Sequence, residues 1–269
     1  MQGRSGQLER CELRVRGRRV VHHAAGAGEP LVLVHGLAGS ARWWRPIVPA
    51  LARRRRLLLI DLPGFGGMRG AARYLRSRDA AAWLADWAAA AGLESADFGG
   101  HSMGAMVALR LAARRPELVR RLALVAPAGM PSERSPLGYV LPVLRATLAY
   151  SPDFLLVLGR DLLRAGPLTL LDAARGVLAA DVRADLERLR APLLLIWGED
   201  DRIVPPALAE LFQAAAPQAA LVTIPGAGHV PMYTRPGELA AALSAFLDQG
   251  SPASAASSDA SAASRRGAL

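Results

Sequence analysis

Short apolar runs recur along the chain, and most of them show no alternation with polar residues. They occupy residues 31–34, 57–60, 122–125 and 193–197, with a weaker run at 221–224. Strands that are apolar at every position are buried on both faces, which is typical of a parallel sheet covered by helices. These runs therefore predict the central strands of a parallel sheet.

Stretches with helical periodicity lie between the apolar runs, at residues 79–91, 103–114, 206–216 and 237–247. Strands that alternate with helices indicate βαβ units. The expected fold class is α/β, with a mostly parallel central sheet and helices on both faces. At the N-terminus, residues 8–15 and 19–24 flank Gly17 and predict a β-hairpin, in which His22 and His23 are expected at the surface.

One long segment breaks the alternation of strands and helices. Residues 131–190 contain helical stretches punctuated by prolines and no candidate strand. We therefore predict a core of residues 1–130 and 191–250, a helical cap inserted at 131–190, and a disordered Ser/Ala-rich tail at 251–269. Apolar side chains of the cap are expected either to line a substrate cavity or to pack on the sheet: Leu137, Tyr139, Val140, Leu141, Leu144, Phe154, Leu155 and Leu158.

Composition narrows the range of functions. The 269 residues include a single cysteine, which excludes an internal disulfide framework and any multi-cysteine metal site.

The net charge is +10, and all 33 basic residues are arginine. The run Arg53–Arg56 is expected in a solvated turn before a strand, and no nucleic-acid motif accompanies it, so no nucleic-acid partner is expected. No signal peptide or long apolar span is evident, so a cytoplasmic location is expected.

Three candidate catalytic residues each follow a predicted strand. Ser102 lies in Gly100-His101-Ser102-Met103-Gly104, which opens a predicted helix. The pattern G-x-S-x-G between strand and helix is typical of a nucleophile elbow, a tight turn that exposes the serine hydroxyl. Asp201, with Asp200 as the alternative, follows the strand at 193–197, and His229 follows the strand at 221–224. Ligands of open parallel sheets bind beyond the carboxyl ends of the strands, where these residues are expected to meet.

Together with His35-Gly36, the segment Asp61–Gly66 and Trp197–Asp201, these motifs resemble the α/β-hydrolase superfamily, in its branch of capped serine hydrolases. The resemblance implies that Ser102 is the nucleophile, His229 the base and Asp201 its orienting acid. It also implies that the backbone N–H groups of Leu37 and Met103 form an oxyanion hole. A triad of this kind needs no metal and no organic cofactor.

The expected activity is hydrolysis of a carboxylic ester through an acyl-enzyme, as in carboxylesterases and lipases. The expected partner is a small-molecule substrate with an apolar acyl group of some size. Acyl transfer and cofactor-free perhydrolysis with the same triad remain alternatives. A C–C bond hydrolase is less favoured, because His101 and Val230 stand where those relatives commonly have asparagine and tryptophan. The non-enzyme alternative is a ligand-binding protein on the same fold. Contact of the cap with a membrane surface is a less favoured option, and the sequence does not indicate the oligomeric state.

Overall fold

The computed structural model describes residues 7–68, 80–131 and 136–249, and its described strands form one sheet. These strands are β1 (Glu9–Val15), β2 (Arg18–Ala25), β3 (Glu29–Val34), β4 (Arg55–Ile60), β5 (Ala96–His101), β6 (Val119–Val125), β7 (Leu193–Gly198) and β8 (Ala220–Ile224). Their order across the sheet is β1-β2-β4-β3-β5-β6-β7-β8. Strands β3 to β8 pair in parallel, whereas the β1–β2 hairpin joins β4 antiparallel. The predicted α/β class with a mostly parallel sheet is confirmed.

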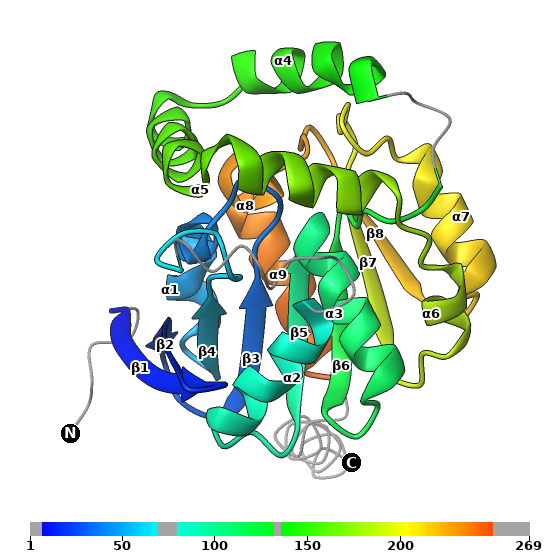
Figure 1. The fold of residues 1–269 in the computed structure, drawn as a ribbon. Coiled ribbons are helices and arrows are strands. Elements are labelled where there is room, and N and C mark those ends of the chain that lie inside the picture. Colours follow the sequence, from blue (N-terminus) through cyan, green and yellow to red (C-terminus); the bar gives the residue numbers. More distant parts are fainter. Residues whose placement is uncertain (1–6, 69–79, 132–135, 250–269) are drawn as a thin grey trace, which may run out of the picture.

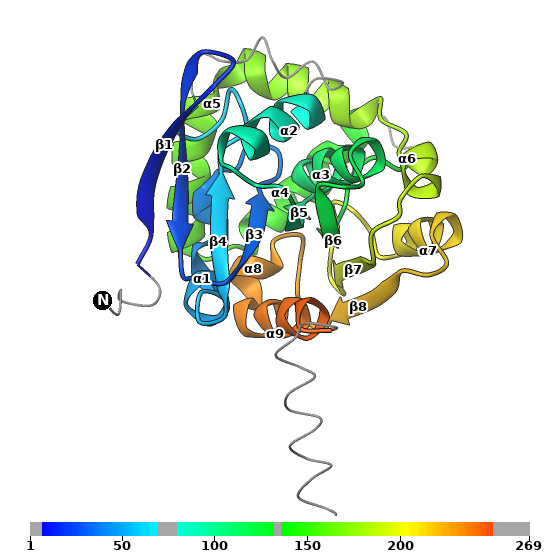
Figure 2. The same ribbon diagram turned by 90° about the horizontal axis from the view of Figure 1, so that it is seen from below.

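Helices cover both faces of the sheet, which explains why the central strands are apolar at every position (Figure 2). On one face lie α2 (Ala80–Ala90), α3 (Met103–Arg114) and α7 (Ala207–Ala215), and on the other lie the 3-10 helix η1 (Ala41–Ile47), α1 (Val48–Leu51) and α9 (Pro236–Leu247). In β3, Val32 and Val34 join the first of these cores, while Leu31 and Leu33 join the second. Strand β3 therefore contributes to both cores at once.

The segment between β6 and β7 crosses the carboxyl ends of the parallel strands (Figure 1). It contains the short 3-10 helix η3 (Pro136–Tyr139), α4 (Val140–Leu148), α5 (Pro152–Leu178) and α6 (Arg183–Glu187), and no strand within described residues 136–190. The side chain of Ser151 accepts a hydrogen bond from the Phe154 N–H and so caps α5. Gly166, at φ 73°, interrupts α5 just before Pro167. The tail predicted at 251–269 lies outside the described residues.

The side chains expected to line a cavity within this segment are arranged differently from the prediction. Val140, Leu141, Leu144 and Leu155 are exposed, because α4 buries none of its residues and Leu155 lies on an outer part of α5. Phe154 is buried, while Tyr139 and Leu158 are half-buried. The side chain of Leu137 lies outside the described part of the structure. In the described residues, no helix is both long enough and apolar enough to cross a membrane.

His22 is buried, so its predicted surface position is wrong. Strand β2 lies between β1 and β4, and the His22 ring packs edge-on against Trp87 of α2 at a centroid distance of 5.4 Å. Burial lowers the pKa of His22 to about 4. Its neighbour His23 points to the opposite face and is half-buried. The predicted hairpin is thus confirmed, but its second strand is an inner strand whose His22 face is covered by a helix.

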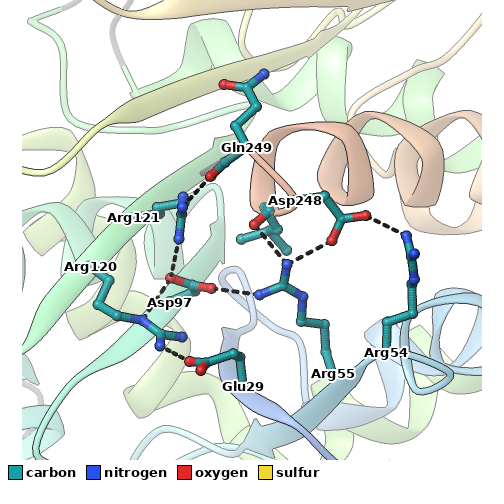
Figure 3. Close-up of polar contacts among 9 residues, drawn as sticks. Glu29, Arg54, Arg55, Asp97, Arg120, Arg121, Asp248 and Gln249 are labelled. Atoms are coloured by element: carbon teal, nitrogen blue, oxygen red, sulfur yellow. Dashed lines mark hydrogen bonds and ion pairs between the residues drawn. The ribbon is translucent and has the colours of Figure 1, made fainter. Parts of the chain in front are cut away.

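Arg55 corrects the expectation of a solvated arginine turn. It is the first residue of β4 and is buried, while Arg54 and Arg56 are exposed. Its guanidinium pairs with the buried Asp97 carboxylate at 3.2 Å and donates to the Leu247 carbonyl at 2.7 Å (Figure 3). Buried carboxylates need a charged partner, and the last carbonyls of a helix need donors. Arg55 satisfies both requirements, at the end of the sheet opposite the segment of α4 and α5.

Candidate active site

Ser102 lies in the tight turn between β5 and α3. Its backbone has φ 50° and ψ −114°, a conformation that non-glycine residues rarely adopt and that is concentrated at functional sites. The Ser102 N–H donates to the Val125 carbonyl at 2.9 Å, which holds the turn against β6. A Cβ at Gly104 would approach the Val34 and His35 carbonyl oxygens closer than 3.0 Å. The flanking glycine is therefore required for α3 to pack beside β3.

His229 and Asp201 form a buried pair. The His229 Nδ1 atom lies 2.8 Å from Asp201 Oδ2. The other carboxylate oxygen, Oδ1, accepts hydrogen bonds from the N–H groups of Ile203 and Val204, each at 2.9 Å. Because an ionised carboxylate only accepts, the imidazole proton lies on Nδ1 and leaves the Nε2 lone pair available. Asp200, the alternative acid, is exposed.

The loops that carry Asp201 and His229 pack tightly on each other. The Asp200 N–H donates to the Ala227 carbonyl at 2.8 Å, and the Glu199 N–H donates to the Ile224 carbonyl at 3.1 Å. A Cβ at Gly198 would meet the carbonyl oxygens of Ala227 and Gly228 at less than 3.0 Å. Backbone contacts between the ends of β7 and β8 thus bring together two side chains that lie 28 positions apart.

His101 connects the serine turn with the histidine loop. Its Nε2 lies 2.8 Å from the His229 carbonyl oxygen, which can only accept, so Nε2 carries the proton. The two imidazole rings lie 4.8 Å apart between centroids. Burial, reinforced by the neighbouring His229, lowers the pKa of His101 well below its usual range. A neutral His101, which directly precedes Ser102, therefore holds the backbone of His229 close to the serine turn.

The loop after β3 reaches the same place. A Cβ at Gly36 would lie 2.6 Å from His101 Nδ1 and 3.2 Å from the Cβ of Ser102. The Gly39 N–H closes a turn onto the Gly36 carbonyl at 3.1 Å, with Ala38 at φ 61°. Among the residues that the structure describes, no acceptor contacts the N–H groups of Leu37 or Met103. Two backbone donors beside Ser102 are thus unpaired in the described structure, one in the loop after β3 and one at the first residue of α3.

His35 and Asp61 brace these loops. The Leu62 N–H donates to His35 Nε2 at 3.0 Å, while His35 Nδ1 lies 2.8 Å from the Gly36 carbonyl oxygen. The Asp61 carboxylate accepts from the N–H groups of Ala41 at 2.6 Å and Gly67 at 2.7 Å. Both side chains are committed to backbone groups, so they shape the loops after β3 and β4.

Sequence reasoning missed a buried link between α5 and the loop after β3. The Ser40 hydroxyl donates to Asp161 Oδ2 at 2.6 Å, and both residues are almost fully buried. Burial raises the pKa of the Asp161 carboxyl. The available signal was helical spacing, since Asp161 shares the inner stripe of α5 with Phe154 and Ala165.

Aromatic side chains gather beside this link. The Phe154 ring lies 5.1 Å from Trp43, 4.8 Å from Tyr150 and 4.3 Å from Tyr233, between centroids. Trp43 also contacts His101 at 5.7 Å. These side chains join α5 to the elements that surround Ser102 and His229. Among the described residues, no group of three or more His, Cys, Asp or Glu side chains is arranged to hold a metal ion.

Comparisons with known proteins identify the family of the chain and confirm its fold. The model of the alpha/beta hydrolase family matches residues 31–242. The pimeloyl-[acyl-carrier protein] methyl ester esterase of Aeromonas hydrophila subsp. hydrophila is 31% identical over 250 residues, covering 82% of this chain and 96% of the relative. A crystal structure of a membrane phospholipase A, described as a bacterial virulence factor, is 28% identical with a TM-score of 0.72, covering 90% of this chain and 86% of the other.

A thermophilic esterase from Thermogutta terrifontis shares the fold, with a TM-score of 0.77 at 24% identity over 90% of this chain and 98% of the other. A mostly parallel sheet covered by helices on both faces, with further helices inserted after β6, is the fold shared with these hydrolases. The chain belongs to the alpha/beta hydrolase family, among the enzymes that hydrolyse ester bonds.

Proposed function

We propose that the chain is a carboxylesterase that forms an acyl-enzyme on Ser102. His229 is the general base, Asp201 its orienting acid, and the Leu37 and Met103 N–H groups form the oxyanion hole. The observation that carries the proposal is the buried His229–Asp201 pair, joined through His101 to the strained Ser102 turn. We further propose that residues 131–190 act as a cap over this site.

In the acylation step, His229 Nε2 removes the Ser102 hydroxyl proton as Oγ attacks the ester carbonyl. Asp201 keeps the proton of the imidazole on Nδ1 and stabilises the imidazolium that forms. The backbone N–H groups of Ile203 and Val204, which donate to Asp201 Oδ1, hold this carboxylate in place while the charge develops. His229 then gives its new proton to the leaving alcohol, and the acyl group remains on Ser102.

The oxyanion of each tetrahedral intermediate carries a full negative charge beside α3. The Met103 N–H is the first of this helix, so it adds the positive end of the helix dipole to its own hydrogen bond. One oxyanion donor contributes on the order of 3 kcal/mol to transition-state stabilisation. In the deacylation step, water attacks the acyl-enzyme with His229 again as base, and the carboxylic acid leaves.

The relatives suggest which ester to test. Their name specifies a methyl ester of an acyl group borne on a carrier protein. By that likeness we propose an acyl ester with a small alcohol as the leaving group. An aromatic cluster supports an apolar acyl chain, because aromatic faces bind alkyl groups without needing polar partners. The cluster is centred on Phe154, includes Trp43, Tyr150 and Tyr233, and reaches His101 through Trp43.

The test is hydrolysis of p-nitrophenyl esters from acetate to palmitate, followed by acyl methyl esters, with the wild type beside Ser102→Ala. We expect turnover to fall at least about 10³-fold in the variant, which loses the nucleophile but keeps its fold. Circular dichroism and thermal unfolding check the fold. The preferred chain length measures the acyl pocket.

Turnover close to wild type in Ser102→Ala would overturn the assignment of the nucleophile. Labelling of wild type, but not of Ser102→Ala, by a fluorophosphonate supports the acyl-enzyme independently of the chosen ester. Product analysis with a competing alcohol or with peroxide then separates hydrolysis from acyl transfer and perhydrolysis. A folded wild type that neither turns over esters nor takes the label would favour a ligand-binding protein.

A further inference from the structure

We propose that the outer face of α4 and α5 binds the surface of an anionic phospholipid membrane. This inference goes beyond the catalytic assignment and does not depend on it. Among the described residues, all but one of the large apolar side chains that are exposed lie between residues 140 and 178. The exception is Leu211 on α7. The exposed apolar surface is thus concentrated on two helices rather than scattered over the molecule.

The outer face of α4 is almost entirely apolar. Val140, Leu144 and Leu148 follow each other at four-residue spacing and so form one stripe, with exposed fractions of 52%, 55% and 86%. Leu141 and Val143 flank this stripe and are exposed as well. No residue of α4 is buried. An amphipathic helix packed on a core shows the reverse pattern, with its apolar stripe turned inward.

Helix α5 is buried along one side and exposes apolar side chains along the other. Phe154 and Asp161, seven residues apart, lie on its inner side and are buried. Leu156 and Leu163, also seven residues apart, lie on the opposite side with exposed fractions of 74% and 85%. After the interruption at Gly166, the exposed stripe continues with Leu168, Leu171 and Leu178. The inner stripe accounts for packing within the chain, and the outer stripe is left for a partner.

Charge indicates the nature of this partner. Three exposed arginines lie among the leucines: Arg145 on α4, and Arg160 and Arg175 on α5. The exposed acidic residues of the same two helices are Asp153 and Asp172. Arginine stems can lie along hydrocarbon while the guanidinium reaches lipid phosphates. Apolar side chains edged by arginines on helices that lie in the plane of the surface are typical of interfacial membrane contact.

Two other occupants fit these observations less well. A second copy of the chain would bring two molecules of net charge +10 face to face, which opposes association. An acidic carrier protein would pair with the arginines but would leave the outer leucines in water. A lipid surface satisfies both groups, since its hydrocarbon takes the leucines and its phosphates take the arginines. The helices lie beyond the carboxyl ends of the strands, so docking would turn the Ser102 side of the sheet toward the lipid (Figure 1).

Flotation of the full chain with vesicles tests the proposal. Vesicles of phosphatidylcholine mixed with phosphatidylglycerol are compared with vesicles of phosphatidylcholine alone, at low and high salt. We expect binding to the mixed vesicles, weaker binding to the neutral ones, and weaker binding at high salt. The double variant Leu148→Gln/Leu163→Gln should bind the mixed vesicles at least about tenfold more weakly. The matched control is Leu211→Gln, an exposed leucine on α7, which should bind like wild type.

The double variant Arg145→Gln/Arg160→Gln should bind the mixed vesicles no more strongly than it binds vesicles of phosphatidylcholine alone. All these variants should hydrolyse a water-soluble p-nitrophenyl ester like wild type, so loss of vesicle binding is separable from loss of the proposed activity. Absence of wild-type binding, or equal loss in Leu211→Gln, would overturn the proposal. So would a dimer in sedimentation velocity that the leucine variant abolishes. Binding to an acidic carrier protein that needs the arginines, with no binding to vesicles, would assign the face to that protein instead.

Discussion

Replacing Asp201 by asparagine changes the orienting group of the proposed triad at almost constant volume. The structure determines how the new amide must turn. Oδ1 of Asp201 accepts two backbone N–H groups, so the amide oxygen of asparagine must occupy that position. The amide NH₂ then faces His229 Nδ1 and donates to it. The imidazole is forced to carry its proton on Nε2, where it cannot accept the proton of Ser102.

The size of the effect follows from the cost of the opposite amide orientation. Turning the NH₂ toward the backbone would leave the N–H groups of Ile203 and Val204 without an acceptor, at about 1–3 kcal/mol each. The productive tautomer thus lies about 2–6 kcal/mol higher in the variant. At 1.36 kcal/mol per tenfold in rate, kcat falls by roughly 30-fold to 10⁴-fold, the upper value being typical of a wrong tautomer in a serine triad.

The assay compares kcat for a p-nitrophenyl ester in wild type, Asp201→Asn and Asp200→Asn. Asp200 is the exposed neighbour, so its variant should keep wild-type turnover. Both backbone hydrogen bonds to Oδ1 survive in Asp201→Asn, so its unfolding free energy should change by about 1 kcal/mol or less. An Asp201→Asn enzyme within threefold of wild type would refute the reasoning, and a large loss in Asp200→Asn alone would move the role to that residue.

Three further changes test the packing of the fold. Arg55→Met should lower the unfolding free energy in urea by about 1–3 kcal/mol, because Asp97 loses the most buried of its three arginine partners and the Leu247 carbonyl loses its donor, whereas an unchanged midpoint relative to exposed Arg56→Met would contradict this. The folded pKa of His22 lies below the unfolded value of 6.5, so the unfolded state binds more protons and stability falls as pH drops from 6.5 toward about 4, by up to about 3 kcal/mol. Urea titrations of His22→Leu should show a smaller fall, and an identical pH dependence would exclude His22 as the source. Gly104→Ala should lose about 1–3 kcal/mol of unfolding free energy through overlap with the Val34 and His35 carbonyls, while Gly159→Ala, with open space around it, should not; equal thermal shifts would count against the overlap.

The sheet, and the places of the candidate catalytic residues after strand ends, were predictable because each depends on local pattern. Apolar runs predicted the central strands, and the predicted helix after Ser102 begins and ends as observed, at Met103 and Arg114. Gly104, Asp201 and His229 were singled out because each closely follows a predicted strand. These features need only a few neighbouring residues to be recognised.

Features that depend on packing between distant segments were not predictable. The run of four arginines is uniform in sequence, and the positions of Asp97 on β5, two strands away, and of the end of α9 select Arg55 for burial. The apolar helices after β6 have hydrophobic residues on several sides, so the pattern alone does not show which side is covered. His22 is buried because α2 covers β2, a contact that no local signal indicates.

The network of Figure 3 ties the chain together at the amino ends of its strands. Arg55 begins β4, Asp97 lies near the start of β5, and Arg120 and Arg121 lie near the start of β6, while the carbonyl of Leu247 comes from the end of α9. Strands β4, β5 and β6 and the end of α9 are thus joined at the amino ends of the strands, opposite the end of the sheet where Ser102 lies. The described helices between β6 and β7 contribute no residue to this network, so a change in their length or charge would leave these contacts at the amino ends of the strands intact.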